Sequence, residues 1–310
     1  MIVVAGEALM DLIVSPAGTL QARPGGGPYN AARTLGLLGA ECPYLGVLAD
    51  DYFGSQLRQR LLDSNVRIGC SSITTAPSTL AVAQLSPDGS ASYRFYLEGT
   101  SLPMLSAKEA WAGLPEAYDA LHVGTLGLVG EPTASVLETL VDHAAADHVI
   151  MLDPNCRPAV VTDLPAFRDR ILRMIDKADL IKVSEDDVSF LFPDGGFDEV
   201  IESAVARGAI VLHTAGADPI DVYAHGVTAQ VVPAQGGSVD TVGAGDIFGA
   251  TVLWALLENG WGKDLRWGVD QVAPAVRTGA TAAHIACQRA GAEPPTLAEL
   301  KAYLTTTAVT

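Results

Sequence analysis

Short apolar runs rich in β-branched residues alternate along this chain with longer segments whose apolar residues recur at helical spacing. Solid apolar runs of this kind are typical of strands buried on both faces of a parallel sheet. The runs with strand character are 2–6, 148–152, 180–183 and 209–213. The segments with helical character are 28–38, 131–146, 165–176 and 198–207, and residues 245–304 are mostly helical as well. The alternation predicts an α/β fold, doubly wound, with a mostly parallel sheet and helices on both faces.

One stretch breaks this alternation. Residues 80–85 and 91–96 flank Pro87-Asp88-Gly89-Ser90, a sequence typical of a tight turn, and so predict a β-hairpin. We interpret this hairpin as part of a small β lid, formed by about 12–21 and 76–100, on a single domain spanning 1–310. The alternative is an ordinary antiparallel edge of the main sheet.

Composition narrows the class of protein. Of the 310 residues, 49% are hydrophobic and 18% charged, which favours a sizeable core and argues against disorder. The chain has 19 Lys and Arg against 36 Asp and Glu, a net charge of −17. Binding to a phosphate backbone or an anionic membrane depends on clustered basic residues, so we expect neither a nucleic-acid nor a membrane partner.

Sequence features also bear on the compartment. The four cysteines, at positions 42, 70, 156 and 287, form no C-x-x-C pair and no disulfide framework. Residues 1–10 lack the basic segment of a signal peptide, and the longest apolar run, 247–257, is too short to cross a bilayer. We therefore expect a cytoplasmic protein with reduced thiols.

Residues 240–246, with the sequence DTVGAGD, lead directly into a long apolar helix that starts near Gly245. A helix N-terminus exposes unpaired N–H groups with a partial positive charge, and small residues such as Gly243 and Ala244 let an anion approach them. A carboxylate beside that anion, at Asp246, suits a general base that deprotonates a hydroxyl attacking a bound phosphate. The alternative is that Asp246 only caps the helix.

A second glycine-rich segment, 25–30 (GGGPYN), precedes the helix predicted at 28–38. Gly26 and Gly27 permit close backbone approach, and Asn30 lies in the first helical turn. Together with Asp11, near the end of the first strand, Asn30 offers the donors and acceptors that orient sugar hydroxyls. Taken alone the segment is more typical of an ordinary loop before a helix, because such glycine-rich loops are common.

Polar residues follow three further strands, at the carboxyl ends where open α/β sheets bind ligands. Residues 153–157 (DPNCR) place Arg157 near a phosphate or, alternatively, beside a surface carboxylate. Residues 184–187 (SEDD) suit a Mg²⁺ held mainly through water by Glu185 and Asp187, or alternatively a capped acidic first turn. Residues 214–216 (TAG) are suited to approach a nucleotide.

Taken together these segments resemble the PfkB (ribokinase-like) family of carbohydrate kinases over essentially the whole chain, and most of all its fructokinases. The motifs that carry the resemblance are 6–11 (GEALMD) with 25–30, 153–157, and 240–246. The resemblance implies a doubly wound sheet with a β lid, ATP and Mg²⁺ as cosubstrates, often a monovalent cation such as K⁺, and homodimers that form through the lid.

By motif position, the resemblance also implies roles for particular residues. Asp246 is the expected base, and Gly243, Ala244 and Gly245 form the expected anion hole. The expected sugar ligands are Asp11, Gly26, Gly27, Asn30, Asp246 and the lid residues Arg94 and Tyr96. The expected nucleotide ligands are Arg157, Lys182, Ser184, Thr214, Gly216, Gly243 and Gly245. The expected metal ligands are Glu185 and Asp187 for Mg²⁺ and Asp240 for the monovalent cation.

The sequence departs from the family pattern in three places. Pro219 stands near where the family usually has a second glycine after residues 214–216, which implies a different shape for the nucleotide loop. Ser184 and Asp187 stand where the family often has N-x-x-E, which implies a different arrangement around Mg²⁺. Tyr29 replaces a small residue, and we expect it to narrow the sugar pocket.

Several functions compete. We expect an ATP-dependent sugar kinase acting on fructose or a related ketohexose. A 2-keto-3-deoxygluconate kinase would need a cation for its acidic substrate, with Arg94 as candidate, and a ribokinase or nucleoside kinase could stack a base on Tyr29. Two other classes are an NAD-dependent oxidoreductase, whose glycine turn should instead follow the first strand, and a non-catalytic sugar-binding regulator, against which Asp246 argues.

Overall fold

The computed structural model describes residues 1–86, 91–233 and 236–307. Its main sheet has eight strands in the order β14-β13-β12-β11-β10-β9-β1-β4. These strands are β1 (Ile2–Ala5), β4 (Tyr44–Leu45), β9 (Ala120–Gly124), β10 (Val149–Asp153), β11 (Leu180–Ser184), β12 (Ile210–Thr214), β13 (Ile220–Ala224) and β14 (Val227–Val231). From β12 to β4 every pairing is parallel, and β13 and β14 add an antiparallel edge.

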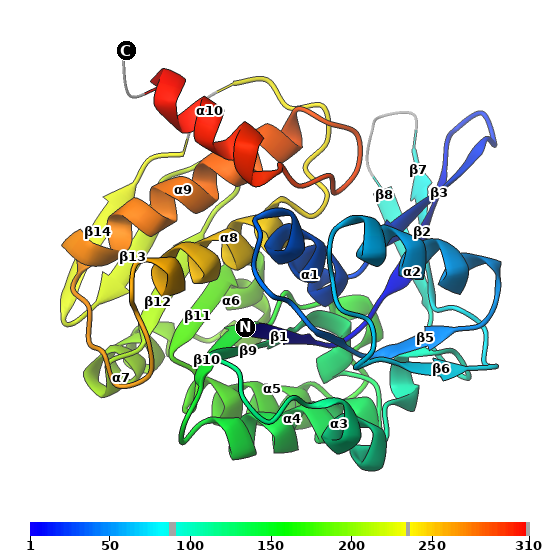
Figure 1. The fold of residues 1–310 in the computed structure, drawn as a ribbon, viewed down its shortest axis with the longest axis horizontal. Coiled ribbons are helices and arrows are strands. Elements are labelled where there is room, and N and C mark those ends of the chain that lie inside the picture. The colour runs from blue at the N-terminus through cyan, green and yellow to red at the C-terminus, as the bar shows by residue number, and fades with distance from the viewer. Residues whose placement is uncertain (87–90, 234–235, 308–310) are drawn as a thin grey trace.

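Helices cover both faces of this sheet, as the sequence predicts (Figure 1). One face packs against α1 (Gly27–Leu37), α2 (Tyr52–Asp63), α8 (Ala244–Glu258) and α9 (Val269–Cys287), and α10 (Leu297–Thr307) packs on α9. The other face packs against α3 (Ala107–Gly113), α4 (Thr133–Ala144), α5 (Leu164–Ile175), α6 (Glu185–Leu191) and α7 (Phe197–Arg207). Short elements are β5 (Val47–Ala49), β6 (Ser72–Thr74), η1 (Leu102–Met104), η2 (Thr125–Leu128) and η3 (Pro158–Val160).

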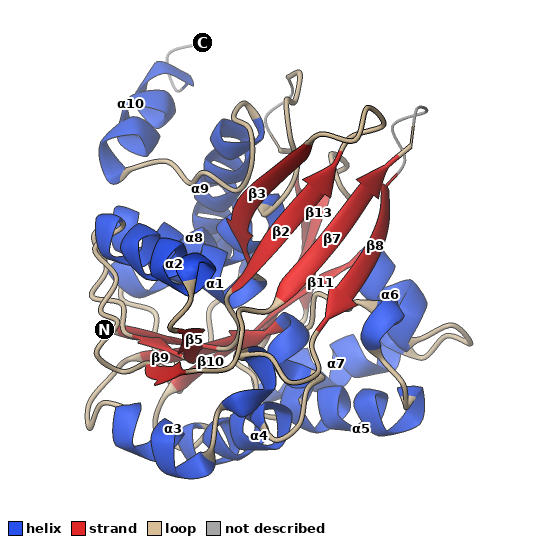
Figure 2. Cartoon of the chain, turned by 90° about the vertical axis from the view of Figure 1, so that its right-hand side faces the viewer, coloured by secondary structure: helices blue, strands red, loops and turns tan. Residues whose placement is uncertain are grey.

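Strands β3 (Leu20–Gly25), β2 (Leu9–Val14), β7 (Leu80–Leu85) and β8 (Ala91–Tyr96) form a second, small sheet in that order. Figure 2 shows these four strands side by side, rising from the level of the main sheet and projecting beyond it. The predicted pairing of β7 with β8 is confirmed, and the alternative of an edge on the main sheet is wrong. The predicted turn at 87–90 lies outside the described residues.

The small sheet covers one end of the main sheet with its apolar side. Ala81 and Ala83 are almost fully buried, at 1% and 5% exposure, and Ala81 packs in a cluster with Leu9, Leu102 and Leu126. Because side chains alternate along a strand, the opposite side of β8 carries Arg94 and Tyr96, and half of Tyr96 is exposed. The sheet therefore has one side turned to the protein and one turned to solvent.

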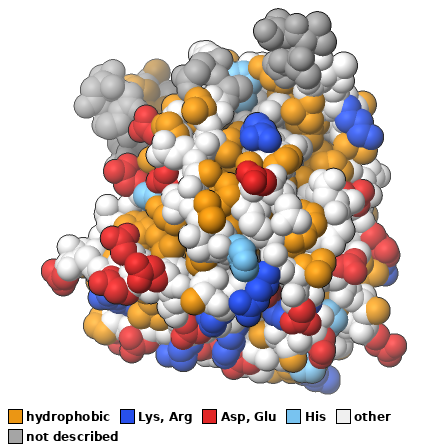
Figure 3. Space-filling model, turned by 90° about the vertical axis from the view of Figure 1, so that its left-hand side faces the viewer, with side chains coloured by type: hydrophobic (Ala, Val, Ile, Leu, Met, Phe, Trp, Pro, Cys, Tyr) orange, Lys and Arg blue, Asp and Glu red, His pale blue; other side chains and the backbone are white. Residues whose placement is uncertain are grey.

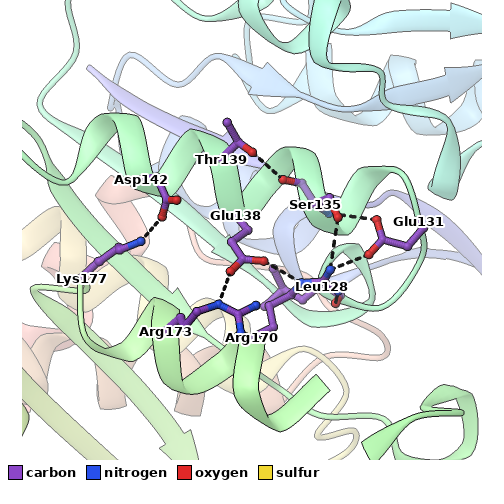
Figure 4. A network of polar contacts seen from close by, with 9 residues as sticks. All are labelled: Leu128, Glu131, Ser135, Glu138, Thr139, Asp142, Arg170, Arg173 and Lys177. Carbon is purple, nitrogen blue, oxygen red and sulfur yellow. Dashed lines mark hydrogen bonds and ion pairs between the residues drawn. The ribbon is translucent and has the colours of Figure 1, made fainter. Parts of the chain in front are cut away.

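A network of ion pairs joins α4 to α5 on the outside of the molecule (Figure 4). Arg170 donates to Glu138 and to the backbone oxygen of Leu128, and Arg173 donates to the other oxygen of Glu138. An isolated surface pair contributes only about 0–1 kcal/mol, but here Glu138 pairs with both arginines and Arg170 pairs with Glu131 as well. The network thereby anchors η2, the turn after β9, to the helical layer.

The surface carries the acidic excess. Figure 3 views the side with the edge strands β13 and β14, where acidic side chains are spread over the face and several Lys and Arg side chains gather in the lower middle of the view. In the part of the chain that the structure describes, no helix combines the length and apolar character needed to cross a membrane.

Candidate active site

A cavity of about 910 Å³ lies where the parallel strands end and the small sheet begins. Its walls include residues at or just beyond the ends of five strands of the main sheet: Glu7, Thr125, Asn155, Ser184 and Thr214. The carboxyl ends of parallel strands are where open α/β sheets bind ligands, and the volume is in the range of about 300–1,000 Å³ typical of small-molecule sites. Asp11, Asn30 and Asp246 share this cavity, as the sequence predicts.

Asp246 is held between two amide groups. Its Oδ2 accepts a hydrogen bond of 2.9 Å from Nδ2 of Asn30, and its Oδ1 accepts one of 2.9 Å from Nδ2 of Asn155. The side chain is 7% exposed, and it lies in the first turn of α8, where the helix dipole favours a negative charge. We call Asn30 and Asn155 the amide clamp. The clamp fixes both oxygens of the carboxylate in direction while leaving each a further lone pair.

Asn155 is itself fixed by Arg157. The guanidinium Nη1 donates to Oδ1 of Asn155 at 2.6 Å and to its backbone oxygen at 2.9 Å. Because Oδ1 is engaged in this way, the amide must point its Nδ2 at Asp246. A second contact fixes the same loop, because the Cys156 N–H donates to Oδ1 of Asp187 at 2.6 Å. The predicted alternative, a bond from Arg157 to a surface carboxylate, is wrong, because Arg157 lines the cavity and bonds its own loop.

The predicted anion hole lies at the N-terminus of α8. Gly243, Ala244 and Gly245 all line the cavity. Gly243 has a φ of 74°, and a Cβ there would lie 2.4 Å from Cβ of Ala292, so only glycine fits. A Cβ at Gly245 would meet Nζ of Lys182 at 3.1 Å, which locates that ammonium directly against the helix terminus.

Lys182 and Asp153 form a buried ion pair beneath this helix. Their Nζ and Oδ1 are 3.2 Å apart, and the side chains are 4% and 3% exposed. Burial works to lower the pKa of Lys182, but the carboxylates of Asp153, Asp187 and Asp246 outweigh it and raise that pKa. Burial raises the pKa of Asp153, with Lys182 acting against it. The ammonium therefore stays charged and adds positive potential at the predicted anion hole.

The glycine loop before α1 is held by a buried glutamate. Glu7 accepts hydrogen bonds from the N–H groups of Gly27, at 3.1 Å, and Gly127, at 2.9 Å. Burial raises its pKa to about 8, although these backbone bonds act in the opposite direction. A Cβ on Gly27 would lie 2.2 Å from Oγ1 of Thr125 and 3.2 Å from Oδ1 of Asp246, so the chain can pass the carboxylate only at glycine.

The predicted sugar ligands Asp11, Gly26, Gly27 and Asn30 line the cavity at the end nearest the small sheet. Burial raises the pKa of Asp11 to about 6; nearby Arg157 lowers it and Asp246 raises it further. The surrounding wall is apolar, with Leu9, Ile13, Ala83, Tyr93, Phe95 and Leu126. A pocket of this make-up combines few polar groups with a large apolar surface, as small-molecule sites do.

Two sequence predictions about this end are wrong. Tyr93 and Phe95 line the cavity, so Arg94 and Tyr96, which alternate with them on β8, lie on the other side of the small sheet and do not reach it. The ring of Tyr29 does not narrow the pocket either. It is fully buried in the core between α1 and the sheet, with Arg33 over one face at 5.9 Å.

The other end of the cavity has the predicted nucleotide ligands. Lys182, Ser184, Thr214 and Gly216 line it. Sequence reasoning missed a part of this wall that comes from β13 and α9: Ile220, Ala280, Ala283, His284 and Cys287. These residues are far apart in sequence and form no motif, so only the packing of α9 over the sheet brings them together.

Two of the predicted metal ligands, Asp187 and Asp240, are engaged with other partners. Ser184 caps α6, and the carboxylate of Asp187 accepts from the Ser184 N–H at 2.8 Å and hydroxyl at 2.7 Å. The alternative interpretation, a capped acidic turn, is thus the arrangement present. Among the described residues Asp186 lines the cavity, whereas Glu185 and Asp187 do not. Asp240 bonds Arg23 of the small sheet.

This protein has a doubly wound α/β fold, with a main sheet between two helical layers. Its small-molecule site lies at the carboxyl ends of the parallel strands. The chain belongs to the pfkB family of carbohydrate kinases, whose model matches residues 1–299. It is therefore a phosphotransferase that acts on a sugar hydroxyl.

Individual relatives agree with this assignment. The chain is similar to a fructokinase of Rhizobium leguminosarum bv. trifolii, with 37% identity over 266 residues that cover 83% of this chain and 79% of the relative. In fold it is similar to the Xylella fastidiosa fructokinase solved with ATP, at a TM-score of 0.89 and 22% identity, covering 99% of this chain and 98% of that one. It is also similar to the Vibrio cholerae fructokinase solved with fructose, ADP and calcium, at a TM-score of 0.83, 23% identity and 98% coverage of both chains.

The amide clamp makes a testable prediction. In Asn155→Ala, Asp246 loses one of its two amide donors, and a hydrogen bond to a charged group contributes about 1.5–3 kcal/mol, so we expect kcat to fall by about 10- to 100-fold. The KM for nucleotide should change little. Steady-state kinetics on the sugar substrate measure both. Asn259→Ala, which removes an amide bonded to the Ala255 carbonyl at the far end of α8, is the control. An unchanged kcat in Asn155→Ala would show that the clamp does not matter for turnover.

Proposed function

We propose that this protein is an ATP-dependent fructokinase, which transfers the γ-phosphoryl group of ATP to a hydroxyl of fructose or a closely related ketohexose. The observation that carries the proposal is the single cavity shared by Asp11, Asn30 and Asp246, with Asp246 at the N-terminus of α8. The names of the relatives support the choice of fructose and of ATP.

In the proposed reaction the carboxylate of Asp246 takes the proton from a sugar hydroxyl as its oxygen attacks the γ-phosphorus of ATP. The P–O bond to the leaving ADP breaks, and the proton remains on Asp246 until product leaves. The N–H groups at Gly243 and Gly245 stabilise charge on the transferred phosphoryl group. Donors preorganised in this way are worth about 3–4 kcal/mol each. Ala244, the third residue predicted for the anion hole, does not offer a free donor, because its N–H donates to the backbone oxygen of Thr241 at 3.2 Å. Lys182, against Gly245, adds a fixed positive charge.

We propose that the nucleotide binds at the end formed by Thr214, Gly216 and α9, with its phosphates directed at α8. Apolar residues such as Ile220 and Ala283 suit a base, and Ser184 and Lys182 suit phosphate oxygens. Arg157 contributes mainly by holding Asn155, because its Nη1 serves its own loop. Through Asn155, Arg157 acts mainly on the catalytic base Asp246 and only secondarily on a phosphate group.

Mg²⁺ fits this site only in part. Asp186 and Ser184 line the cavity and supply oxygen atoms, which Mg²⁺ prefers, whereas the carboxylate of Asp187 is already engaged in the helix cap. We propose that Asp186 holds the ion through water together with the nucleotide phosphates, where it would neutralise charge on the triphosphate.

The small sheet acts in this proposal as a lid over the sugar. Its apolar side, with Ala83, Tyr93 and Phe95, faces the cavity and would exclude water from the reacting phosphoryl group. Arg94, the cation required for the 2-keto-3-deoxygluconate alternative, lies on the other side of this sheet. Tyr29, required to stack a nucleoside base, is buried in the core. Neither rival keeps the residue that favoured it.

Asp246→Asn removes the base while keeping its shape, and we expect it to lower kcat by at least about a thousandfold with nucleotide binding nearly intact. Purified enzyme is assayed with a panel of ketohexoses, 2-keto-3-deoxygluconate and ribose, and ATP binding to both forms is measured by calorimetry. Wild-type turnover highest with an acidic sugar would reject fructose, and wild-type-like turnover in Asp246→Asn would reject the base.

Asp11 makes sugar binding depend on pH. Its pKa is raised to about 6, and only the ionised carboxylate accepts hydrogen bonds with both oxygens, so binding weakens as pH falls through that value. We expect the KM for fructose to rise about tenfold from pH 7 to pH 5. Asp11→Asn should bind more weakly at pH 7 and lose this dependence. A KM profile equally steep in Asp11→Asn would assign the titration to another group.

The outer side of the small sheet supports a proposed homodimer. Leu20 and Tyr96 are exposed there by 60% and 50%. Two copies that pair through these sides would bury them, and light scattering after gel filtration should give a dimer mass that Tyr96→Glu shifts toward the monomer. A wild-type protein that elutes as a monomer at all concentrations contradicts the proposal.

A further inference from the structure

Asp240 joins three separate segments of the chain just before the predicted anion hole. Its Oδ2 accepts from Nη1 of Arg23 at 2.9 Å and from the N–H of Gly291 at 2.8 Å. Its Oδ1 accepts from the N–H of Val242 at 3.0 Å. Arg23 belongs to β3 of the small sheet, and Gly291 to the loop between α9 and α10. Asp240 thus fixes the residues that lead into α8 to two elements distant in sequence.

Both terminal nitrogens of the Arg23 guanidinium are held by hydrogen bonds. Its Nη2 donates to Oε1 of Gln21 at 3.0 Å, while Nη1 bonds Asp240. The arm lies against the backbone of Gly291, where a Cβ would be only 3.5 Å from Cδ of Arg23. The two side chains are 30% and 20% exposed, so the pair is partly shielded from water. A planar guanidinium held at several points loses little freedom on pairing and is always charged.

This arrangement does not fit a monovalent cation on Asp240. An alkali ion needs oxygen lone pairs and negative charge. Here Oδ2 uses its two lone pairs on the Arg23 guanidinium and the Gly291 N–H, and Arg23 already balances the charge of the carboxylate. A second positive charge at the same carboxylate would be repelled by the guanidinium. The family resemblance assigns Asp240 to such an ion. In this chain the guanidinium of Arg23 supplies the positive charge at that carboxylate instead.

We propose that Arg23 replaces the monovalent cation at Asp240, so that turnover of this enzyme does not require K⁺. The proposal rests on the proposed kinase function for its activity assay. It has a structural consequence as well. Arg23 is the strand partner of Asp11 in the pairing of β3 with β2, so one strand pair carries a sugar ligand and the residue that secures the anion-hole loop. The loop is thereby set by the protein rather than by the salt in solution.

The test compares K⁺ with tetramethylammonium at constant ionic strength. For wild-type enzyme we expect kcat with ATP and fructose to agree within about twofold in the two salts. Arg23→Gln should lose at least about tenfold in tetramethylammonium and recover much of that loss in K⁺, which can then reach Asp240. Arg23→Lys, which keeps a charge, should remain insensitive to K⁺. Arg67→Gln, which breaks an exposed ion pair with Glu41, is the matched control.

Three results would overturn the proposal: wild-type enzyme activated several-fold by K⁺, Arg23→Gln as active as wild type without K⁺, or Arg23→Gln inactive in both salts. A second readout needs no substrate. K⁺ should raise the thermal midpoint of Arg23→Gln and leave that of wild type unchanged, and a midpoint of Arg23→Gln that ignores K⁺ counts against the proposal. If wild-type protein fails to phosphorylate fructose, the function proposed above is wrong, whereas the thermal comparison still decides the question about Arg23.

Discussion

The site depends on keeping one carboxylate charged and correctly aimed inside the protein. A buried carboxylate without partners is costly, and Asp246 meets that cost with two amide donors and a helix N-terminus. Asn30 comes from α1, Asn155 from the loop after β10, and Asp246 from α8. The position of the Asp246 carboxylate therefore depends on how α1, α8 and the loop after β10 pack against one another. Gly27 passes beside it because any side chain there would collide with Thr125 or Asp246.

Charge around this carboxylate is arranged locally and runs against the balance of the whole chain. The protein has a net charge of −17, and the nucleotide of the proposed reaction is also an anion. Screening limits such long-range repulsion to about 8 Å at physiological salt. Within that range the structure gathers the α8 terminus, the buried ammonium of Lys182 and the guanidinium of Arg157. An acidic surface and the proposed anion-binding site are thus compatible.

Much of the fold follows from the sequence, because parallel strands such as β1 and β10 are continuous apolar runs, and such runs predict strands that are buried on both faces. The edge hairpin of β13 and β14 was missed, since its alternating pattern depends on lying at an edge. In the small sheet the period of β8 is evident, but its phase is not. Both sides of that strand carry an aromatic residue, so sequence alone cannot tell whether Phe95 or Tyr96 faces the cavity, and only pairing with the buried Ala81 decides it.

Site residues show the same division between local and tertiary information. Asp246, Asp11 and Asn30 stand in local motifs, and a motif at the end of a strand or the start of a helix is enough to bring them to one cavity. Asn155 lay within a motif, yet its contact with Asp246 depends on Arg157 and on Asp187 holding the loop from below. Asp187 illustrates why chemistry type alone misleads. A carboxylate at a strand end suits a metal, but three residues after a serine that caps a helix it first satisfies backbone and hydroxyl donors, and those bonds turn it away from the cavity.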